Sequence, residues 1–438
     1  MKRLSIVLPL ICCALSQAQN KKDQEHWVAT WATAQQAVRP GPPAGRGAQP
    51  TPTPAGPVAP ATPPPSPGAR FDNQTVRMIA HASIAGKRVR IELSDAVGAL
   101  AVTVGAAHIA LRAKDSEIVA GSDRALTFGG KPACTLRPGV LTVSDPVDLD
   151  VPMLADLAVS LYFPTETGPP TSHSLGLHTT YISQPGDFTG QAAIADAATV
   201  QSYYFLASID VLAPAKAATI VALGDSITDG ARSTPDADRM WPALLAARLQ
   251  ANKATAQFAI VNEGISGNQV LKDAAGTSAI ARFDRDVLSE PGVEWLMILE
   301  SINDIGAIAR GGGPLTAADL IGALGQLVER SHMHGIKVAG CTLTPYGGAG
   351  YYSDAGEAIR SAVNDWIRTS GTFDAVVDFD AAVRDPANPK EFRADMHAGD
   401  HLHPSDAGYA VMADSVDLSI FAGKPVGSKP KDKPKKNK

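Results

Sequence analysis

The chain has 438 residues, of which 45% are hydrophobic and 19% are charged, and its formal net charge is −5. This length is sufficient for two or three domains that each bury a core of their own. The small negative charge excludes the extended basic surface with which proteins bind nucleic acid, so we expect no nucleic-acid partner.

The first residues have the layout of a secretory signal. Lys2 and Arg3 precede a mostly apolar run over residues 4–15, and Ser16, Gln17 and Ala18 follow it. This pattern predicts a signal peptide over residues 1–18 and a secreted or periplasmic protein. The run is too short for a permanent anchor, and no later segment offers the roughly 18 uninterrupted apolar residues of a spanning helix. We therefore expect no stable insertion into a membrane.

Two segments have compositions that do not build a core. Residues 19–70 contain a short strand-like piece, Trp27 to Trp31, followed by a stretch dominated by Pro, Gly, Ala and Thr, which is typical of an extended linker. Residues 425–438 include six lysines among the last ten positions, which predicts a disordered, solvated basic tail.

Residues 71–212 have the character of β-structure. Short segments of alternating or β-branched residues are separated by Gly, Pro, Asp and Asn, which predicts a β-sandwich accessory domain of jelly-roll-like type. Cys134 lies here and Cys341 lies in the following domain, and their spacing does not decide whether they pair. Buried apolar filling is the role that we expect for both.

Residues 213–424 alternate between apolar strands and amphipathic helices. This alternation predicts an α/β domain whose parallel sheet is covered on both faces. In such sheets the functional residues follow the carboxyl ends of the strands. The predicted strands are 218–223, 258–262, 294–300, 337–343 and 375–379, and the predicted helices are 241–250, 278–288, 317–334 and 356–369.

Three of these strands are followed by residues that suit acyl transfer. Ser226 comes directly after the first strand, at the exposed rim of the predicted sheet. The chain contains no Gly-x-Ser-x-Gly elbow, which disfavours the α/β-hydrolase type of serine catalysis. Gly267 follows the second strand and can present a bare N–H. Asn303 follows the third strand and can donate to a developing oxyanion, while the adjacent Asp304 either contacts substrate or caps a helix.

A histidine-rich segment lies near the C-terminus. A carboxylate three residues before a histidine can fold back and orient the imidazole, as Asp400 could do for His403. From the residues alone, three histidines compete as general base and two aspartates compete as the orienting acid. The candidates are His397, His401, His403, Asp395 and Asp400. The same density of ligands leaves a metal-dependent hydrolase open as an alternative, with His397, Asp400, His401 and His403 around a divalent ion.

Together the four blocks resemble the SGNH (GDSL-type) hydrolase family, in which they occur in this order over residues 217–422. The β-rich region resembles that of a bacterial secreted subgroup of the family. The resemblance implies a three-layer α/β/α, flavodoxin-like hydrolase domain. The sequence departs from the family pattern at one position, where Ser301 replaces the glycine that the third block often has.

The resemblance also assigns roles to single residues. It implies Ser226 as nucleophile, His403 as base and Asp400 as its orienting acid. It further implies an oxyanion hole formed by Ser226, Gly267 and Asn303, and it requires no metal or cofactor. Tyr346, Tyr351 and Tyr352, in a loop after the fourth strand, are candidates for lining the pocket.

We therefore expect a secreted serine esterase that works through an acyl-enzyme and removes short acyl groups, such as acetyl, from polysaccharide. A lipase, phospholipase or aryl esterase of the same family is the alternative within this class. A non-catalytic carbohydrate-binding protein is the alternative from another class, and it would leave the four blocks without a purpose.

Overall fold

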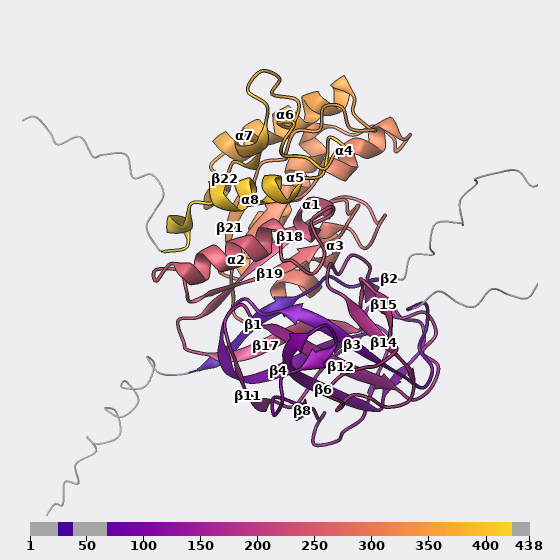
Figure 1. The fold of residues 1–438 in the computed structure, drawn as a ribbon. Helices are drawn as coiled ribbons and strands as arrows, with labels where there is room; N and C mark the ends of the chain where they lie inside the picture. Colours follow the sequence, from indigo (N-terminus) through magenta and orange to yellow (C-terminus); the bar gives the residue numbers. More distant parts are fainter. Residues whose placement is uncertain (1–24, 38–67, 423–438) are drawn as a thin grey trace, which may run out of the picture.

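The computed structural model describes residues 25–37 and 68–422, which form a β-rich region and an α/β region packed against each other (Figure 1). The predicted signal peptide, most of the Pro-rich stretch and the basic tail lie outside the described residues. Among the helices that are described, none is long and apolar enough to cross a membrane.

The α/β region is built on a five-stranded parallel sheet, as predicted. An inner strand of this sheet, β18, is buried along its whole length. Strands that are covered on both faces are mostly apolar, and in β18 the one polar residue, Thr219, donates its hydroxyl to the carbonyl of Pro291 at 2.7 Å. In spatial order the strands are β19 (Phe258–Gly264), β18 (Ala218–Gly224), β20 (Val293–Leu299), β21 (Lys337–Cys341) and β22 (Ala375–Val377).

Helices pack on both faces of this sheet. Ile220 and Ala222 of β18 belong to a core that contains residues of α2 and α8, whereas Val221 and Leu223 belong to a core that contains residues of α5 and α6. Alternation along the strand therefore distributes its side chains between two cores. The helices are α1 (Ser226–Asp229), α2 (Trp241–Ala251), α3 (Ala279–Phe283), the π-helical turn η1 (Asp284–Leu288), α4 (Ile302–Ala309), α5 (Ala317–Met333), α6 (Asp354–Thr369), α7 (Phe379–Val383), α8 (Asp406–Ser415) and the 3₁₀ turn η2 (Leu418–Ile420).

The β-rich region consists of antiparallel strands, and its two larger sheets share one hydrophobic core. One sheet has the order β1-β17-β4-β10, with β11 also paired to β4. The other has the order β15-β14-β3-β12-β6-β7, with β8 also paired to β6. Smaller sheets join β16, β13 and β2, and β5 and β9.

The bounds of these strands are β1 (His26–Ala32), β2 (Gln36–Ala37), β3 (Gln74–His81), β4 (Gly86–Ser94), β5 (Val102–Val104), β6 (Ala106–Lys114), β7 (Glu117–Ile118), β8 (Arg124–Ala125), β9 (Cys134–Leu136), β10 (Leu141–Val143), β11 (Val147–Val151), β12 (Asp156–Phe163), β13 (Thr171–His173), β14 (Thr180–Pro185), β15 (Ala198–Val200), β16 (Tyr203–Tyr204) and β17 (Leu206–Ala213). The strand-like piece expected at Trp27 to Trp31 is thus β1, which is part of the β-rich region. Cys134 and Cys341 are both free thiols.

Strand β1 joins the two regions. It pairs with β17 along one edge. On its other side, the backbone N–H of Ala29 donates to the carbonyl of Pro291 at 3.0 Å, and Thr33 forms a parallel bridge with Asn262 in β19. The segment of residues 25–37 therefore connects the two regions through backbone hydrogen bonds to both.

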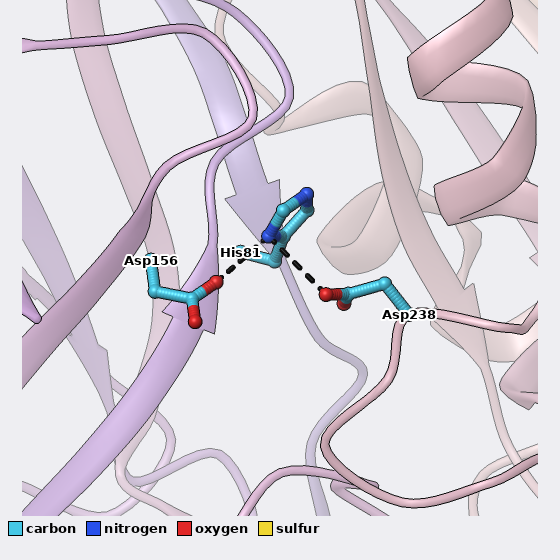
Figure 2. Close-up of side chains that lie close together, drawn as sticks. All are labelled: His81, Asp156 and Asp238. Atoms are coloured by element: carbon cyan, nitrogen blue, oxygen red, sulfur yellow. Dashed lines mark hydrogen bonds and ion pairs between the residues drawn. The ribbon is translucent and has the colours of Figure 1, made fainter. Parts of the chain in front are cut away.

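A second junction is formed by His81, Asp156 and Asp238 (Figure 2). The Nδ1 atom of His81 lies 2.8 Å from Asp156 Oδ1 and 3.4 Å from Asp238 Oδ2. His81 and Asp156 belong to the β-rich region, whereas Asp238 comes from the loop between α1 and α2. Burial alone would lower the pKa of His81, but the hydrogen bond to Asp156 and the charge of Asp238 raise it above its ordinary value. His81 therefore connects the β-rich region to a loop of the α/β region.

The close approach of β19 to α1 can be tested at Gly264. A Cβ added at this position would lie 2.3 Å from the backbone nitrogen of Asp229. Because backbone cannot move aside as a side chain can, we expect Gly264→Ala to lower the free energy of unfolding by about 1–3 kcal/mol. Gly322→Ala is the control, because that exposed glycine of α5 has no atom within 4 Å of an added Cβ. It should stabilise by up to about 1 kcal/mol. Urea unfolding measures both, and equal effects would contradict the close packing.

Candidate active site

Ser226 stands at the first position of α1, immediately beyond the carboxyl end of β18. Asp225 caps this short helix, because its side chain accepts from the backbone N–H of Ile227 at 2.9 Å. Burial raises the pKa of Asp225 to about 7, and the nearby carboxylates of Asp304 and Asp229 add to the rise. The helix ends after one turn at Gly230, whose φ of 101° suits glycine. The turn holds Ser226 beyond the end of β18, as the sequence predicted, but the residue is only 6% exposed and not at an open rim as expected.

A continuous chain of hydrogen bonds joins Ser226, His403 and Asp400. Ser226 Oγ lies 2.9 Å from His403 Nε2, and His403 Nδ1 lies 2.7 Å from Asp400 Oδ2. The other oxygen of Asp400 accepts from the backbone N–H of His403 at 2.9 Å, so the carboxylate holds both ring and backbone. Partial burial alone would raise the pKa of Asp400, but the hydrogen bonds from His403 lower it to about 2. An ionised carboxylate, an oriented imidazole and a hydroxyl in this sequence can move a proton from the serine.

The other candidates for the base and the orienting acid, His397, His401 and Asp395, form other contacts. The rings of His397 and His401 stack with their centroids 4.4 Å apart, and His397 Nδ1 accepts from the backbone N–H of His401 at 3.2 Å. Asp395 pairs with Arg393 and not with a histidine. Within residues 25–37 and 68–422, three or more potential metal ligands converge within 4.8 Å only at His81, Asp156 and Asp238. The four residues of the metal alternative therefore do not form such a group.

The predicted oxyanion donors lie at the ends of the neighbouring strands. Asn303 is in the first turn of α4, and its Nδ2 atom is buried without a hydrogen-bond partner among the described residues. This amide N–H is therefore free to donate to an oxyanion, as the sequence predicted for Asn303. Gly267 has a φ of 81°, a backbone conformation that favours glycine.

Asp304 holds the Gly267 segment in place. Its carboxylate accepts from the backbone N–H groups of Val270 at 2.9 Å and Leu271 at 3.1 Å. Burial raises its pKa to about 6, and these bonds oppose the rise. The sequence left two roles open for Asp304, contact with substrate or a helix cap. The observed bonds correspond to neither role, because they connect the third block to the loop of the second block.

Arg282 is a supporting residue that the sequence reasoning missed. It is fully buried and donates to the carbonyls of Gly224 at 3.0 Å and Glu263 at 2.7 Å, and to Asn268 Oδ1 at 3.0 Å. Its guanidinium thus ties together the ends of β18 and β19 and the loop that carries Gly267. The only signal in the sequence was an arginine four residues before Asp286, with which it forms an ion pair.

The three tyrosines after β21 are not an ordinary surface loop. Tyr346 is fully buried in the core, and its ring lies 5.9 Å from that of Tyr351 and 5.2 Å from that of Tyr352. Burial raises the pKa of Tyr346 to about 12. The guanidinium of Arg310 lies 4.9 Å from the ring of Tyr351. These contacts give the three tyrosines a packing role.

Residues 222–411 match a family model described as GDSL-like Lipase/Acylhydrolase family. This domain belongs to that family. The protein is therefore an ester hydrolase, as predicted. A search of curated proteins found no match.

Solved structures with similarity to the chain include an acetylxylan esterase from Geobacillus stearothermophilus, studied as a catalytic mutant. It is 22% identical, with 48% of this chain and 97% of that chain covered and a TM-score of 0.36. A GDSL-like lipase from Bacteroides thetaiotaomicron is 21% identical, with coverages of 46% and 87% and a TM-score of 0.34. LAE5, an α/β hydrolase enzyme from the metagenome of Lake Arreo, is 23% identical, with coverages of 47% and 95% and a TM-score of 0.36.

Ser301 of this GDSL-like domain provides a test of local strain. Its φ is 104°, and its hydroxyl is buried without a partner among the described residues. A side chain in this conformation costs about 1–3 kcal/mol. Glycine removes the strain and the orphaned hydroxyl, while its freedom in the unfolded chain costs up to about 1 kcal/mol. We therefore expect Ser301→Gly to stabilise the protein by about 1 kcal/mol in urea unfolding. Ser301→Ala, which removes only the hydroxyl, is the control and should gain less.

The low pKa of Asp400 predicts how stability depends on pH. Because the folded-state pKa of about 2 lies below the unfolded value of about 3.9, ionised Asp400 stabilises the fold above about pH 4. This contribution is lost as the pH falls through about 2. We expect the melting temperatures of wild type and Asp400→Asn to differ most at pH 5 and to converge toward pH 2. A difference that stays constant over this range would contradict the assignment.

Proposed function

We propose that this protein is a secreted serine esterase that cleaves carboxylic esters through an acyl-enzyme. The observation that carries the proposal is the unbroken hydrogen-bonded chain from Ser226 through His403 to Asp400. It lies inside a domain of a family of acylhydrolases. The predicted signal peptide is the basis for secretion.

In the proposed mechanism, Ser226 Oγ attacks the ester carbonyl as its proton passes to His403 Nε2. Asp400 stabilises the imidazolium, and His403 then protonates the leaving alcohol. The negative oxygen of the tetrahedral intermediate is held by the N–H groups of Ser226 and Gly267 and by Asn303 Nδ2. A water molecule attacks the acyl-enzyme by the same route, and release of the acid restores the serine.

The proposed substrates are short acyl groups, acetyl above all, on polysaccharide. The predicted signal peptide and the large β-rich region beside the hydrolase domain support this choice. A lipase, phospholipase or aryl esterase activity is the alternative. We also propose a finer description of the fold, in which the hydrolase domain is flavodoxin-like and three-layered and the β-rich region is a jelly-roll-like sandwich. The strand order β19-β18-β20-β21-β22, which is 2-1-3-4-5 along the chain, supports the first part.

The decisive experiment compares wild type with Ser226→Ala and Asn303→Ala on para-nitrophenyl acetate, butyrate and palmitate, with acetylated xylan alongside. We expect Ser226→Ala to lose more than about 10³-fold in kcat, because the nucleophile is removed. Asn303→Ala should lose about 10²–10³-fold, the typical effect of one oxyanion donor. Both variants replace buried side chains at the rim, so their melting temperatures serve as the control for folding.

The pattern across substrates decides the finer proposal. A preference for acetate together with release of acetate from xylan supports the polysaccharide esterase. A preference for palmitate would favour a lipase, and activity on aryl acetates without action on xylan would favour an aryl esterase. Full activity in Ser226→Ala would overturn the mechanism, and loss of activity with a chelator would favour the metal alternative.

A further inference from the structure

A buried ion pair connects the β-rich region to the turn that carries Ser226. His173, at the end of β13, places its Nε2 atom 3.0 Å from Oδ1 of Asp229, the last residue of α1. Both side chains are only 3% exposed. Bulk water and salt therefore screen this interaction far less than they screen a surface pair. The two residues are 56 positions apart in the sequence and belong to different regions.

The surroundings of His173 favour the doubly protonated ring. Its Nδ1 atom lies 2.8 Å from the carbonyl oxygen of Ala34, and a carbonyl oxygen can only accept a hydrogen bond. Its Nε2 atom faces the carboxylate of Asp229. With an acceptor at each nitrogen, the ring donates twice and carries a positive charge opposite Asp229. Ala34 belongs to the segment between β1 and β2. The ring therefore bridges this segment of the β-rich region and α1 of the α/β region.

Asp229 passes this restraint on to the predicted oxyanion hole. Its second oxygen, Oδ2, accepts from the backbone N–H of Ser266 at 2.7 Å and from the Ser266 hydroxyl at 2.6 Å. Ser266 directly precedes Gly267, whose N–H is one of the proposed oxyanion donors. A shift of the Ser266 peptide would therefore move the Gly267 N–H with it, since the two residues share a peptide bond.

We propose that His173 is a positioning residue of the esterase, which acts through Asp229 and Ser266 to aim the Gly267 N–H at the oxyanion. The β-rich region is then a working part of the active site and more than an accessory module. This inference rests on the proposed function, because it requires that Gly267 serves the oxyanion of an ester hydrolase.

The inference predicts an effect on kcat and not on KM. The oxyanion develops only in the transition state, so a misplaced donor weakens transition-state binding and leaves the binding of the neutral ester unchanged. Complete loss of one donor typically lowers turnover by about 10²–10³-fold. Displacement of Gly267 without its removal should cost less, on the order of 10–100-fold.

The experiment measures kcat and KM on para-nitrophenyl acetate for His173→Phe, Asp229→Ala and Asp229→Asn, below the melting temperature of every variant. His173→Phe and Asp229→Ala should each lose about 10–100-fold in kcat with KM within about threefold of wild type. Asp229→Asn should retain most of the activity. Its amide oxygen can still accept from Ser266, and its amide N–H can donate to a neutral His173.

His81→Gln is the matched control. His81 also links the two regions through an aspartate, but its partners Asp156 and Asp238 belong neither to α1 nor to the Gly267 loop. This variant should lower the melting temperature and leave kcat within about twofold of wild type. It thereby separates loosening of the junction from displacement of the oxyanion donor.

Three outcomes would overturn the inference: kcat within twofold of wild type in Asp229→Ala, an effect confined to KM, or equal losses of kcat in His173→Phe and His81→Gln. If His173→Phe does not fold, the comparison of Asp229→Ala with Asp229→Asn decides, and equal kcat values would count against the inference. A failure of the proposed function is seen separately, as full activity in Ser226→Ala.

Discussion

The structure depends on the close contact between the carboxyl ends of β18 and β19 and the single turn of α1. Gly264 approaches the backbone of Asp229 so closely that no side chain fits between them. Around this contact, the Asn262 side chain donates to the carbonyl of Thr228 at 2.8 Å, and the N–H of Ile265 donates to the carbonyl of Gly224 at 2.9 Å. One packed contact therefore sets the positions of Ser226, the proposed nucleophile, and of Gly267, the proposed oxyanion donor. Such preorganisation is what electrostatic stabilisation of an oxyanion requires.

Several carboxyl groups are buried around this contact. Glu263 and Glu300 lie at the ends of β19 and β20, and burial raises the pKa of each well above its ordinary value. Arg282 lies near both carboxyl groups and also donates to the carbonyls at the ends of β18 and β19. Backbone carbonyls at the end of a parallel sheet need donors once the ladder stops. One buried guanidinium meets several of these needs at once, which a hydrophobic residue of similar size could not do.

Much of the α/β region could be predicted from the sequence because its signals are local. Each of the five strands is a short apolar run, and the structure has all five in a parallel sheet. The proximity of Ser226, His403 and Asp400 followed from the order of the blocks and from the resemblance to a family. The residues alone left three histidines in competition. What separates His403 from His401 is the fold of one loop, in which the backbone of His401 takes a positive φ of 59°.

The parts that could not be predicted depend on contacts between distant segments. Nothing near Arg282 in the sequence indicates that it meets Gly224, 58 positions away. The strand-like piece at Trp27 to Trp31 was visible, but its pairing with β17 depends on a partner that lies almost at the other end of the β-rich region. Pairing of such separated segments is decided by the burial of whole faces and not by local propensity.

The contact between the two regions also depends on the burial of whole faces. A free-standing accessory module would present a polar face to its neighbour, with charges at the rim where water can reach them. Here the contact includes a strand, β1, whose Ala29 and Ala32 belong to a core of the α/β region. It also includes the ion pair of His173 and Asp229, which is sealed from solvent. Removal of one partner from a buried pair leaves the other charge unpaired, which is far more costly than the loss of a surface pair. The two regions are therefore expected to fold and unfold as a unit, because neither can expose its half of the joint without exposing buried charge and apolar surface together.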